Sequence, residues 1–251
     1  MEEIKPDRMN DGLFGKNSSM PFLDHLEELR WRLIKSVAAV VLFSFVAFAF
    51  ADQIIVFIRR PLGDVQLYNI AVTGTFYAYL QVSLIVGIFG ALPITFYQLW
   101  AFVSPGLYKS EKKKVIPLVL ISTILFLIGA TFCFEIVLPV SFAFLIGFAG
   151  ELIVNNITIG SYISFVGLLL MAFGFGFQLP MISYFLGKMG IVTSSFLAKG
   201  RRYAIVVFLI LSAVITPPDV FTQFLLAVPL YILYEISIIV VKITQKPLNK
   251  D

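Results

Sequence analysis

Few residues in this chain have side chains suited to acid–base or metal chemistry. It holds one cysteine, Cys133, and one histidine, His25, among 251 residues. A single cysteine forms no intrachain disulfide, and neither a cysteine zinc site nor a two-histidine metal motif is possible. The apolar segments hold no serine–histidine pair and no pair of aspartates. We therefore expect no enzyme activity, no metal and no cofactor.

Two carboxylates lie in basic surroundings, and the second of them, Glu111, could receive a cation. Glu28 lies in residues 24–33 (DHLEELRWRL) and can pair with Arg32, because residues four apart share one face of a helix. Glu111 is the only acid among residues 104–114, which carry four lysines. Each segment also has a plainer explanation: an interfacial helix for the first, and a basic loop that sets topology for the second.

Three further polar residues lie in or beside apolar segments. Asp219 follows two prolines and is positioned to cap the next helix. Gln178 lies deep in an apolar segment, and its amide needs hydrogen-bonding partners, either on a neighbouring helix or in a membrane-facing pocket. Glu235 lies toward the end of the last apolar segment and is expected to reach the interface or to pair with Lys242.

The composition indicates whether the segments that carry these side chains lie in water or in lipid. Apolar residues make up 59% of the chain and charged residues 14%, with a mean hydropathy of +0.93. Soluble domains are about 45–50% apolar and about 25% charged. A soluble enzyme is excluded, and the sequence predicts an all-α integral membrane protein.

Six segments are predicted to cross the membrane, since a spanning helix needs about 20 apolar residues. They are residues 33–51, 76–103, 115–138, 161–186, 203–216 and 220–241. The fifth has only 14 residues between Arg202 and Pro217, and the sixth meets Glu235 after 15 residues. We therefore predict short fifth and sixth spans.

The loops between the spans alternate in charge. Seventeen Lys and Arg residues fall on one side and two, Arg59 and Arg60, on the other. Cytoplasmic loops carry the excess of Lys and Arg, so both termini are predicted to be cytoplasmic. This distribution explains the formal charge of +4 without a nucleic-acid partner. Residues 1–20 are expected to be a flexible tail, residues 21–245 the membrane domain, and residues 246–251 a second tail.

Prolines and loops suggest the shape of the body. Pro93, Pro180 and Pro229 lie within spans and are expected to kink them. Kinked long helices beside short ones favour a concave, cupped arrangement. The two long outer loops contain apolar stretches, residues 54–58 and 142–148, which are expected to fold back as interfacial caps.

Three segments, in order, resemble the TatC family of multi-spanning core subunits of the twin-arginine protein translocase. They are residues 25–33 (HLEELRWRL), 104–112 (SPGLYKSEK) and 216–223 (TPPDVFTQ), and Pro229 with residues 234–236 (YEI) extends the likeness. The resemblance covers about residues 20–245. It implies a receptor in the bacterial cytoplasmic (inner) membrane that binds the Arg-Arg signal peptides of folded export proteins.

The resemblance also implies which residues recognise the signal. The family's two recognition glutamates correspond to Glu28 and Glu111. A guanidinium pairs bidentately with a carboxylate as lysine cannot, and the surrounding lysines would repel peptides that are merely basic. Further family positions correspond to Arg30, Phe102, Leu107, Tyr108 and Lys109 around this site, and to Pro61 and Asp219 elsewhere.

The fourth span departs from the family pattern. Many members carry a glutamate where this chain has Gln178, which keeps hydrogen bonding but no charge. We expect Gln178 to dock toward the transmembrane helix of a partner instead. The family implies TatA-like and TatB-like single-span partners near Gln178 or on the fifth and sixth spans, where Glu235 lies. It also implies a homo-oligomer within the complex, and transport driven by proton-motive force.

A secondary transporter of small solutes is the alternative function. Kinked and short spans can line a substrate site. The spans hold few ionisable groups, however, and the sequence has no sign of two matching halves.

Overall fold

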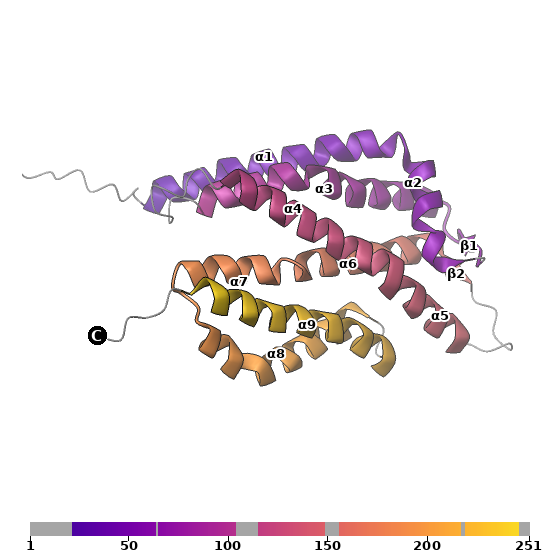
Figure 1. Cartoon of the computed structure of the whole chain (residues 1–251). Coiled ribbons are helices and arrows are strands. Elements are labelled where there is room, and N and C mark those ends of the chain that lie inside the picture. The colour runs from indigo at the N-terminus through magenta and orange to yellow at the C-terminus, as the bar shows by residue number, and fades with distance from the viewer. Residues whose placement is uncertain (1–21, 64, 104–114, 149–155, 217–218, 246–251) are drawn as a thin grey trace, which may run out of the picture.

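The computed structural model describes residues 22–63, 65–103, 115–148, 156–216 and 219–245, and most of them are helical. In chain order the elements are α1 (Phe22–Phe48), α2 (Ala51–Ile58), η1 (Arg60–Leu62), β1 (Leu67–Tyr68), α3 (Gly74–Val103), α4 (Val115–Phe132), η4 (Cys133–Val137), α5 (Leu138–Phe148), β2 (Ile157–Thr158), α6 (Ile159–Gly176), α7 (Leu179–Lys188), α8 (Ser194–Ile215) and α9 (Val220–Thr244). Figure 1 shows the long helices lying side by side in one body.

Helix α1 lies at one edge of the body and packs mainly on α3. Their backbones meet at Gly87, where a Cβ atom would lie 2.7 Å from the backbone nitrogen of Ser44. The other side of α1 leaves large apolar side chains such as Val37, Val41 and Phe45 exposed. Such a surface suits lipid, which solvates apolar side chains as well as a protein core does.

The main core lies between α3, α4 and α6. Phe126 and Phe173 are among its largest fully buried side chains. Helices α4 and α6 cross closely at Gly129, where a Cβ atom would lie 2.7 Å from the carbonyl oxygen of Phe173. Aromatic edges fill the space beside α3: Phe126 makes T-shaped contacts with Phe89 and Phe96.

A small cap covers the end of the bundle at which α3 and α6 begin. Helix α2 folds back on α3, as predicted for residues 54–58. Strands β1 and β2 pair in parallel, with Leu67 opposite Ile157. The hydroxyl of Tyr162 on α6 donates to the carbonyl oxygen of Ile58 at 2.7 Å, which ties α6 to the end of α2.

The second expected fold-back, residues 142–148, is wrong. These residues continue the third span as α5, which follows α4 through the single wide turn η4. Within η4 the amide of Leu138 bonds the carbonyl of Cys133, five residues back. Pro139 follows directly and has no amide hydrogen to donate, so the helix continues past it in a different register.

The fourth predicted span consists of two helices. Helix α6 ends at Gly176, α7 begins at Leu179, and Pro180 occupies the first turn of α7. Proline is tolerated there because the first amides of a helix have no intrahelical acceptor. The break puts Gln178 at the junction, where its side chain is only 5% exposed.

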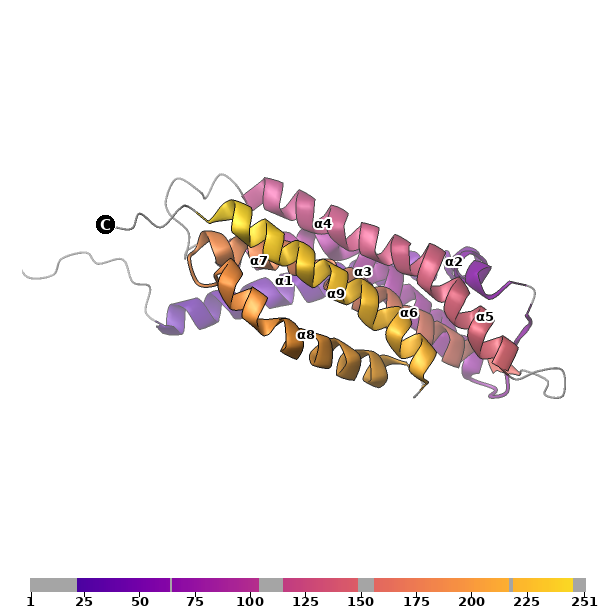
Figure 2. The same cartoon turned by 60° about the horizontal axis from the view of Figure 1, so that its bottom comes forward.

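Helices α8 and α9 form a hairpin on the opposite side of the body from α1 (Figure 1), and this side comes forward in Figure 2. Helix α8 packs mainly on α9, and α9 packs on α7. Helix α9 runs for 25 residues, longer than the 15-residue apolar stretch before Glu235. The sixth helix is therefore not short, because Glu235 finds a partner and the helix continues through it.

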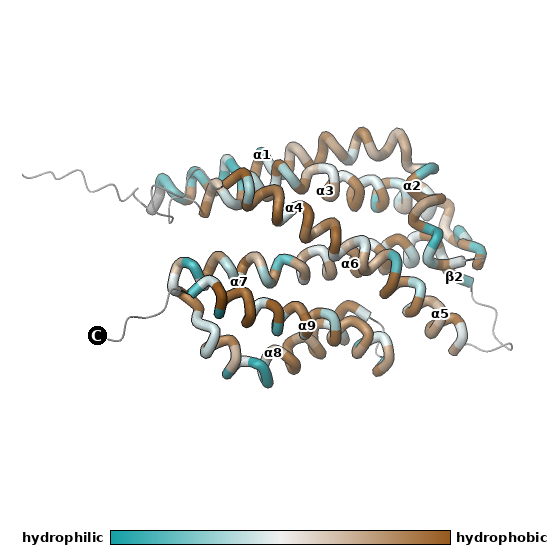
Figure 3. The backbone as a smooth tube through the Cα atoms, in the orientation of Figure 1, coloured by the Kyte–Doolittle hydropathy of each residue, from teal (hydrophilic) through white to brown (hydrophobic). Residues whose placement is uncertain are grey.

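Five helical stretches among the described residues are long and apolar enough to cross a membrane. They are Asp24–Phe48, Gly74–Val103, Val115–Phe148, Ile159–Lys188 and Val220–Thr244. The predicted fifth span lies in α8, whose first turns carry Lys199, Arg201 and Arg202 and so shorten its apolar part. Figure 3 shows hydrophobic positions along the middle of the helices and hydrophilic ones toward their ends.

Candidate functional site

The polar end of α1 holds a carboxylate paired with a guanidinium. Both Nε and Nη2 of Arg32 donate to Oε1 of Glu28, at 2.8 Å and 2.5 Å. The pair was predicted from its spacing of four residues, and it is partly exposed, with 23% of each side chain accessible. The other oxygen, Oε2, is buried and accepts no hydrogen bond from the described residues. Glu28 therefore has one oxygen that accepts hydrogen bonds and one that is buried without a partner among the described residues.

Helix α3 brings two more side chains to this end of α1. Nη1 of Arg32 donates to Oε1 of Gln98 at 3.3 Å. The rings of His25 and Phe102 stack with centroids 4.3 Å apart and planes 8° apart. His25 Nδ1 also lies 3.6 Å from Oε2 of Glu28. The structure thus brings Phe102, a predicted site residue, to the same face of α1 as Glu28.

The remaining predicted members of this site divide into two groups. Arg30 is exposed on α1. It follows Glu28 by two residues, and residues two apart point to nearly opposite sides of a helix, so Arg30 points away from Glu28. Leu107, Tyr108, Lys109 and Glu111 lie outside the described residues. Sequence reasoning missed Gln98; its one signal was a polar side chain near the end of an apolar span.

Gln178 takes part in a buried polar contact between three helices. Its Nε2 donates to the backbone oxygen of Ser122 at 2.9 Å. The hydroxyl of Ser122 accepts from Nε1 of Trp100, also at 2.9 Å. These bonds tie α3, α4 and the α6–α7 junction together. The side-chain amide of Gln178, which the sequence predicted to need a hydrogen-bonding partner, has one within the chain.

Glu235 pairs with Arg201 rather than with Lys242. Nε and Nη2 of Arg201 donate to the two carboxylate oxygens at 2.7 Å and 2.9 Å, and the hydroxyl of Tyr231 donates to Oε1 at 2.8 Å. The hydrogen-bonded carboxylate holds the pKa of the Arg201 guanidinium above its ordinary value. Lys242, about two turns further along α9, is exposed. The ion pair fastens the first turns of α8 to α9.

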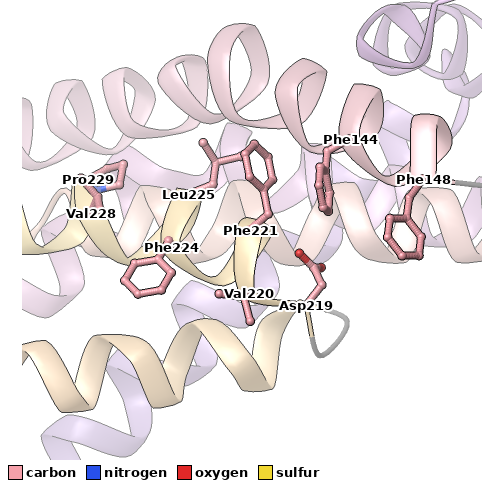
Figure 4. Close-up of a pocket in the computed structure, with 9 residues that line it drawn as sticks. All are labelled: Phe144, Phe148, Asp219, Val220, Phe221, Phe224, Leu225, Val228 and Pro229. Atoms are coloured by element: carbon pink, nitrogen blue, oxygen red, sulfur yellow. The ribbon is translucent and has the colours of Figure 1, made fainter.

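Asp219 caps α9, as predicted. Its Oδ1 accepts from the backbone amide of Thr222 at 2.7 Å, and its Oδ2 accepts from the Thr222 hydroxyl. Beside this cap lies an open groove of about 810 Å³ between α5 and α9. Figure 4 shows it, with lining residues Phe144, Phe148, Asp219, Val220, Phe221, Phe224, Leu225, Val228 and Pro229. Since the carboxylate of Asp219 is engaged, the groove is an apolar surface.

Pro61 lies in η1, where it is partly buried beside Leu62. Its fixed backbone angle suits this tight turn, which packs against α5. Among the residues that the structure describes, no three His, Cys, Asp or Glu side chains gather as metal ligands.

A family model described as Sec-independent protein translocase protein (TatC) matches residues 24–229. That match covers most of the chain. The chain belongs to the TatC family. TatC proteins are components of the twin-arginine protein translocase, so this chain is a translocase component and a multi-pass membrane protein.

Individual TatC proteins resemble the chain over nearly its whole length. The Sec-independent protein translocase protein TatC of Desulforapulum autotrophicum is 42% identical over 237 residues, covering 92% of this chain and 87% of the relative. TatC of Aquifex aeolicus is 41% identical over 233 residues, covering 90% of this chain and 97% of the relative.

Solved TatC structures share this fold. A crystal structure of the twin-arginine translocase receptor TatC has a TM-score of 0.80 at 41% identity, covering 88% of this chain and 99% of the other. A second, of the same receptor in DDM, has a TM-score of 0.79 at 42% identity, covering 86% and 98%.

Proposed function

We propose that this TatC protein is the receptor that binds Arg-Arg signal peptides of folded proteins at the cytoplasmic face of the bacterial inner membrane. One observation carries the proposal: Glu28 already holds a guanidinium, that of Arg32, at the polar end of α1. The local geometry around this carboxylate therefore suits the group that distinguishes the signal. The name of the solved TatC structures, which calls them receptors, supports the same reading.

The second recognition carboxylate is assigned to Glu111. It belongs to residues 104–114, which begin two positions after Phe102. Phe102 stacks on His25, only three residues from Glu28, so α3 ends beside the first carboxylate. Two carboxylates on different segments can each take one of two consecutive guanidinium groups. Lys109 and the other loop lysines repel peptides that are merely basic, while Leu107 and Tyr108 provide contact area.

The orientation in the membrane follows from charge. The start of α1 and the end of α9 lie at the same end of the body as the end of α3 (Figure 1). Seventeen of the nineteen Lys and Arg residues belong to segments assigned to this side. We assign this end, both termini, and the tails of residues 1–20 and 246–251 to the cytoplasm, with six spans between them.

Partner subunits complete the translocase complex. TatA-like and TatB-like single-span proteins are assigned to α8 and α9, whose outer surface is apolar and exposed, and further copies of this chain to the same complex. Glu235 and Asp219 act there by holding the hairpin together, and Gln178 by fixing the α6–α7 junction. Proton-motive force supplies the energy. The short apolar part of α8 would thin the bilayer locally.

Binding of synthetic signal peptides to the purified chain in detergent tests the receptor function. We expect an Arg-Arg peptide to bind more tightly than the same peptide with Lys-Lys. Glu28→Gln and Glu111→Gln should each weaken Arg-Arg binding by roughly tenfold, the effect of losing a charge-assisted hydrogen bond of about 1.5 kcal/mol. Glu27→Gln is the matched control, since Glu27 is exposed on another face of α1. Equal binding of both peptides would refute the function.

A further inference from the structure

We propose that Arg32 is a built-in substitute for the signal arginine: it occupies Glu28 in the empty receptor and transfers to Gln98 when a signal guanidinium binds. This inference rests on the proposed receptor function. It assigns to Arg32 and Gln98 a role in setting the affinity of the receptor for its signal.

The bonds on Glu28 leave room for such an exchange. Both donors of Arg32 converge on Oε1, so the guanidinium does not bridge the two carboxylate oxygens. Oε2 accepts no hydrogen bond from the described residues, and His25 Nδ1 lies 3.6 Å away. A carboxylate oxygen accepts about two hydrogen bonds. Oε2 therefore has unused acceptor capacity, and because this atom is buried, an incoming guanidinium reaches it as Arg32 leaves.

Arg32 has a second acceptor within reach. Its Nη1 already donates to Oε1 of Gln98, which lies 66 residues away on α3. When Nε and Nη2 leave Glu28, this contact keeps the guanidinium at the site. Because 23% of each partner's side chain is exposed, water can also solvate the groups as they separate. Exposed ion pairs within one helix contribute little free energy, so displacing Arg32 from Glu28 costs little.

The exchange lowers the affinity of the site for its ligand and leaves the preference for arginine to Glu28. Any cation that displaces Arg32 must replace the same internal contact, so Arg32 weakens the binding of arginine and lysine ligands by the same factor. The preference for arginine comes from the carboxylate, because an ammonium lacks the planar fork of donors. Arg32 thus raises the concentration at which a cationic ligand occupies the site.

Three variants of the full chain in detergent test this proposal, each assayed with the Arg-Arg and the Lys-Lys peptide. Arg32→Gln removes the competing fork and Arg32→Lys keeps its charge without the fork. Lys35→Gln removes a positive charge from an exposed position on the same helix. Thermal unfolding establishes that each variant is folded, and the charge-conserving Arg32→Lys variant provides the test if Arg32→Gln is unstable.

We expect Arg32→Gln to bind the Arg-Arg peptide at least about twofold more tightly, the factor of an exposed ion pair within one helix. Binding of the Lys-Lys peptide should improve by a similar factor, so that the ratio of the two dissociation constants stays unchanged. Arg32→Lys should also tighten the binding of both peptides, and Lys35→Gln should bind them as the unsubstituted chain does.

Two results would overturn the exchange. Either unchanged or weaker Arg-Arg binding by both Arg32 variants, or equal tightening by Lys35→Gln, would make Arg32 a structural or purely electrostatic residue. The Glu28→Gln variant distinguishes this outcome from a failure of the receptor function. If the chain is the receptor, Glu28→Gln weakens binding of the Arg-Arg peptide whatever Arg32 does. If the chain is not the receptor, Glu28→Gln leaves that binding unchanged.

Discussion

At the scale of single residues, buried polar side chains hold the helices of this protein in register. Gln178 and Trp100 both bond Ser122, one through its backbone oxygen and the other through its hydroxyl. Apolar neighbours and lipid offer these groups no other partners, so each broken bond leaves a donor or acceptor unsatisfied. The contact is therefore a structural requirement of the α3, α4 and α6–α7 arrangement.

Replacing Gln178 by Leu should destabilise the chain by about 0.6–2 kcal/mol, the range for a hydrogen bond in such surroundings. Thermal unfolding in detergent measures the effect. Gln53→Leu is the matched control, because Gln53 is exposed on α2 and its replacement should leave the midpoint unchanged. An unchanged midpoint for Gln178→Leu, combined with lost copurification of partner subunits, would instead make Gln178 a docking residue.

The partners of polar residues show where sequence reasoning ends. Spacing along one helix predicted the Glu28–Arg32 pair, because four residues place two side chains on one face. The same reasoning offered Lys242 to Glu235, whereas the partner is Arg201 on α8. Spacing within a helix says nothing about which turn of another helix lies opposite. Gln98 escaped notice for the same reason.

At the scale of elements, α1 depends on α3 for its position. Gly87 lets the two backbones approach, since a Cβ atom there would lie 2.0 Å from the Ser44 hydroxyl and 2.8 Å from the Ser44 Cα atom. A side-chain hydroxyl can rotate away, but the backbone of α1 cannot move without displacing the whole helix. Glu28 lies on α1 and Gln98 on α3, so this contact also sets the geometry of the recognition site.

Gly87→Ala should therefore lower the thermal midpoint in detergent and weaken Arg-Arg peptide binding together. Gly147→Ala on α5 is the matched control, because a Cβ atom there meets nothing within 4 Å. Alanine is also the better helix former by about 1 kcal/mol, so the control should be neutral or slightly more stable. A Gly87→Ala variant as stable as the control would mean that α1 and α3 tolerate a wider separation.

Element boundaries were predictable where the local chemistry is explicit. Residues 76–103 and 220–241 closely match α3 and α9, and Asp219 caps α9 as its position indicated. The wide turn η4 was not predictable, because an apolar segment has no side-chain signal for a bond between residues five apart. That turn carries the third span past Pro139, which in the sequence resembles a helix end.

At the scale of the whole molecule, α8 is the element on which the number of spans depends. Five stretches of the described residues are long and apolar enough to cross a membrane, and α8 is not among them. It nevertheless runs beside α9 in an antiparallel hairpin, held by the Arg201–Glu235 ion pair at one end and by a bond from Gln223 Nε2 to the Leu209 oxygen at 3.0 Å. If α9 crosses the bilayer, α8 must cross with it.

Cysteine labelling in intact cells tests this topology. Cys133 is fully buried, so the unsubstituted chain should give little background. Thr73→Cys, before α3, and Val220→Cys, in the first turn of α9, introduce thiols at exposed positions assigned to the outer side. Ser195→Cys introduces one at the start of α8, on the side assigned to the cytoplasm.

With the outer membrane permeabilised, a membrane-impermeant maleimide should label the Thr73→Cys and Val220→Cys variants and leave Ser195→Cys unlabelled until the inner membrane is opened. The expectation follows from charge, because the segment around α8 carries four basic residues and the turn before α9 carries none. Labelling of Val220→Cys only after the inner membrane is opened would mean that α8 does not cross. The last helix would then enter from the cytoplasm, and the even number of spans that keeps both termini inside would be lost.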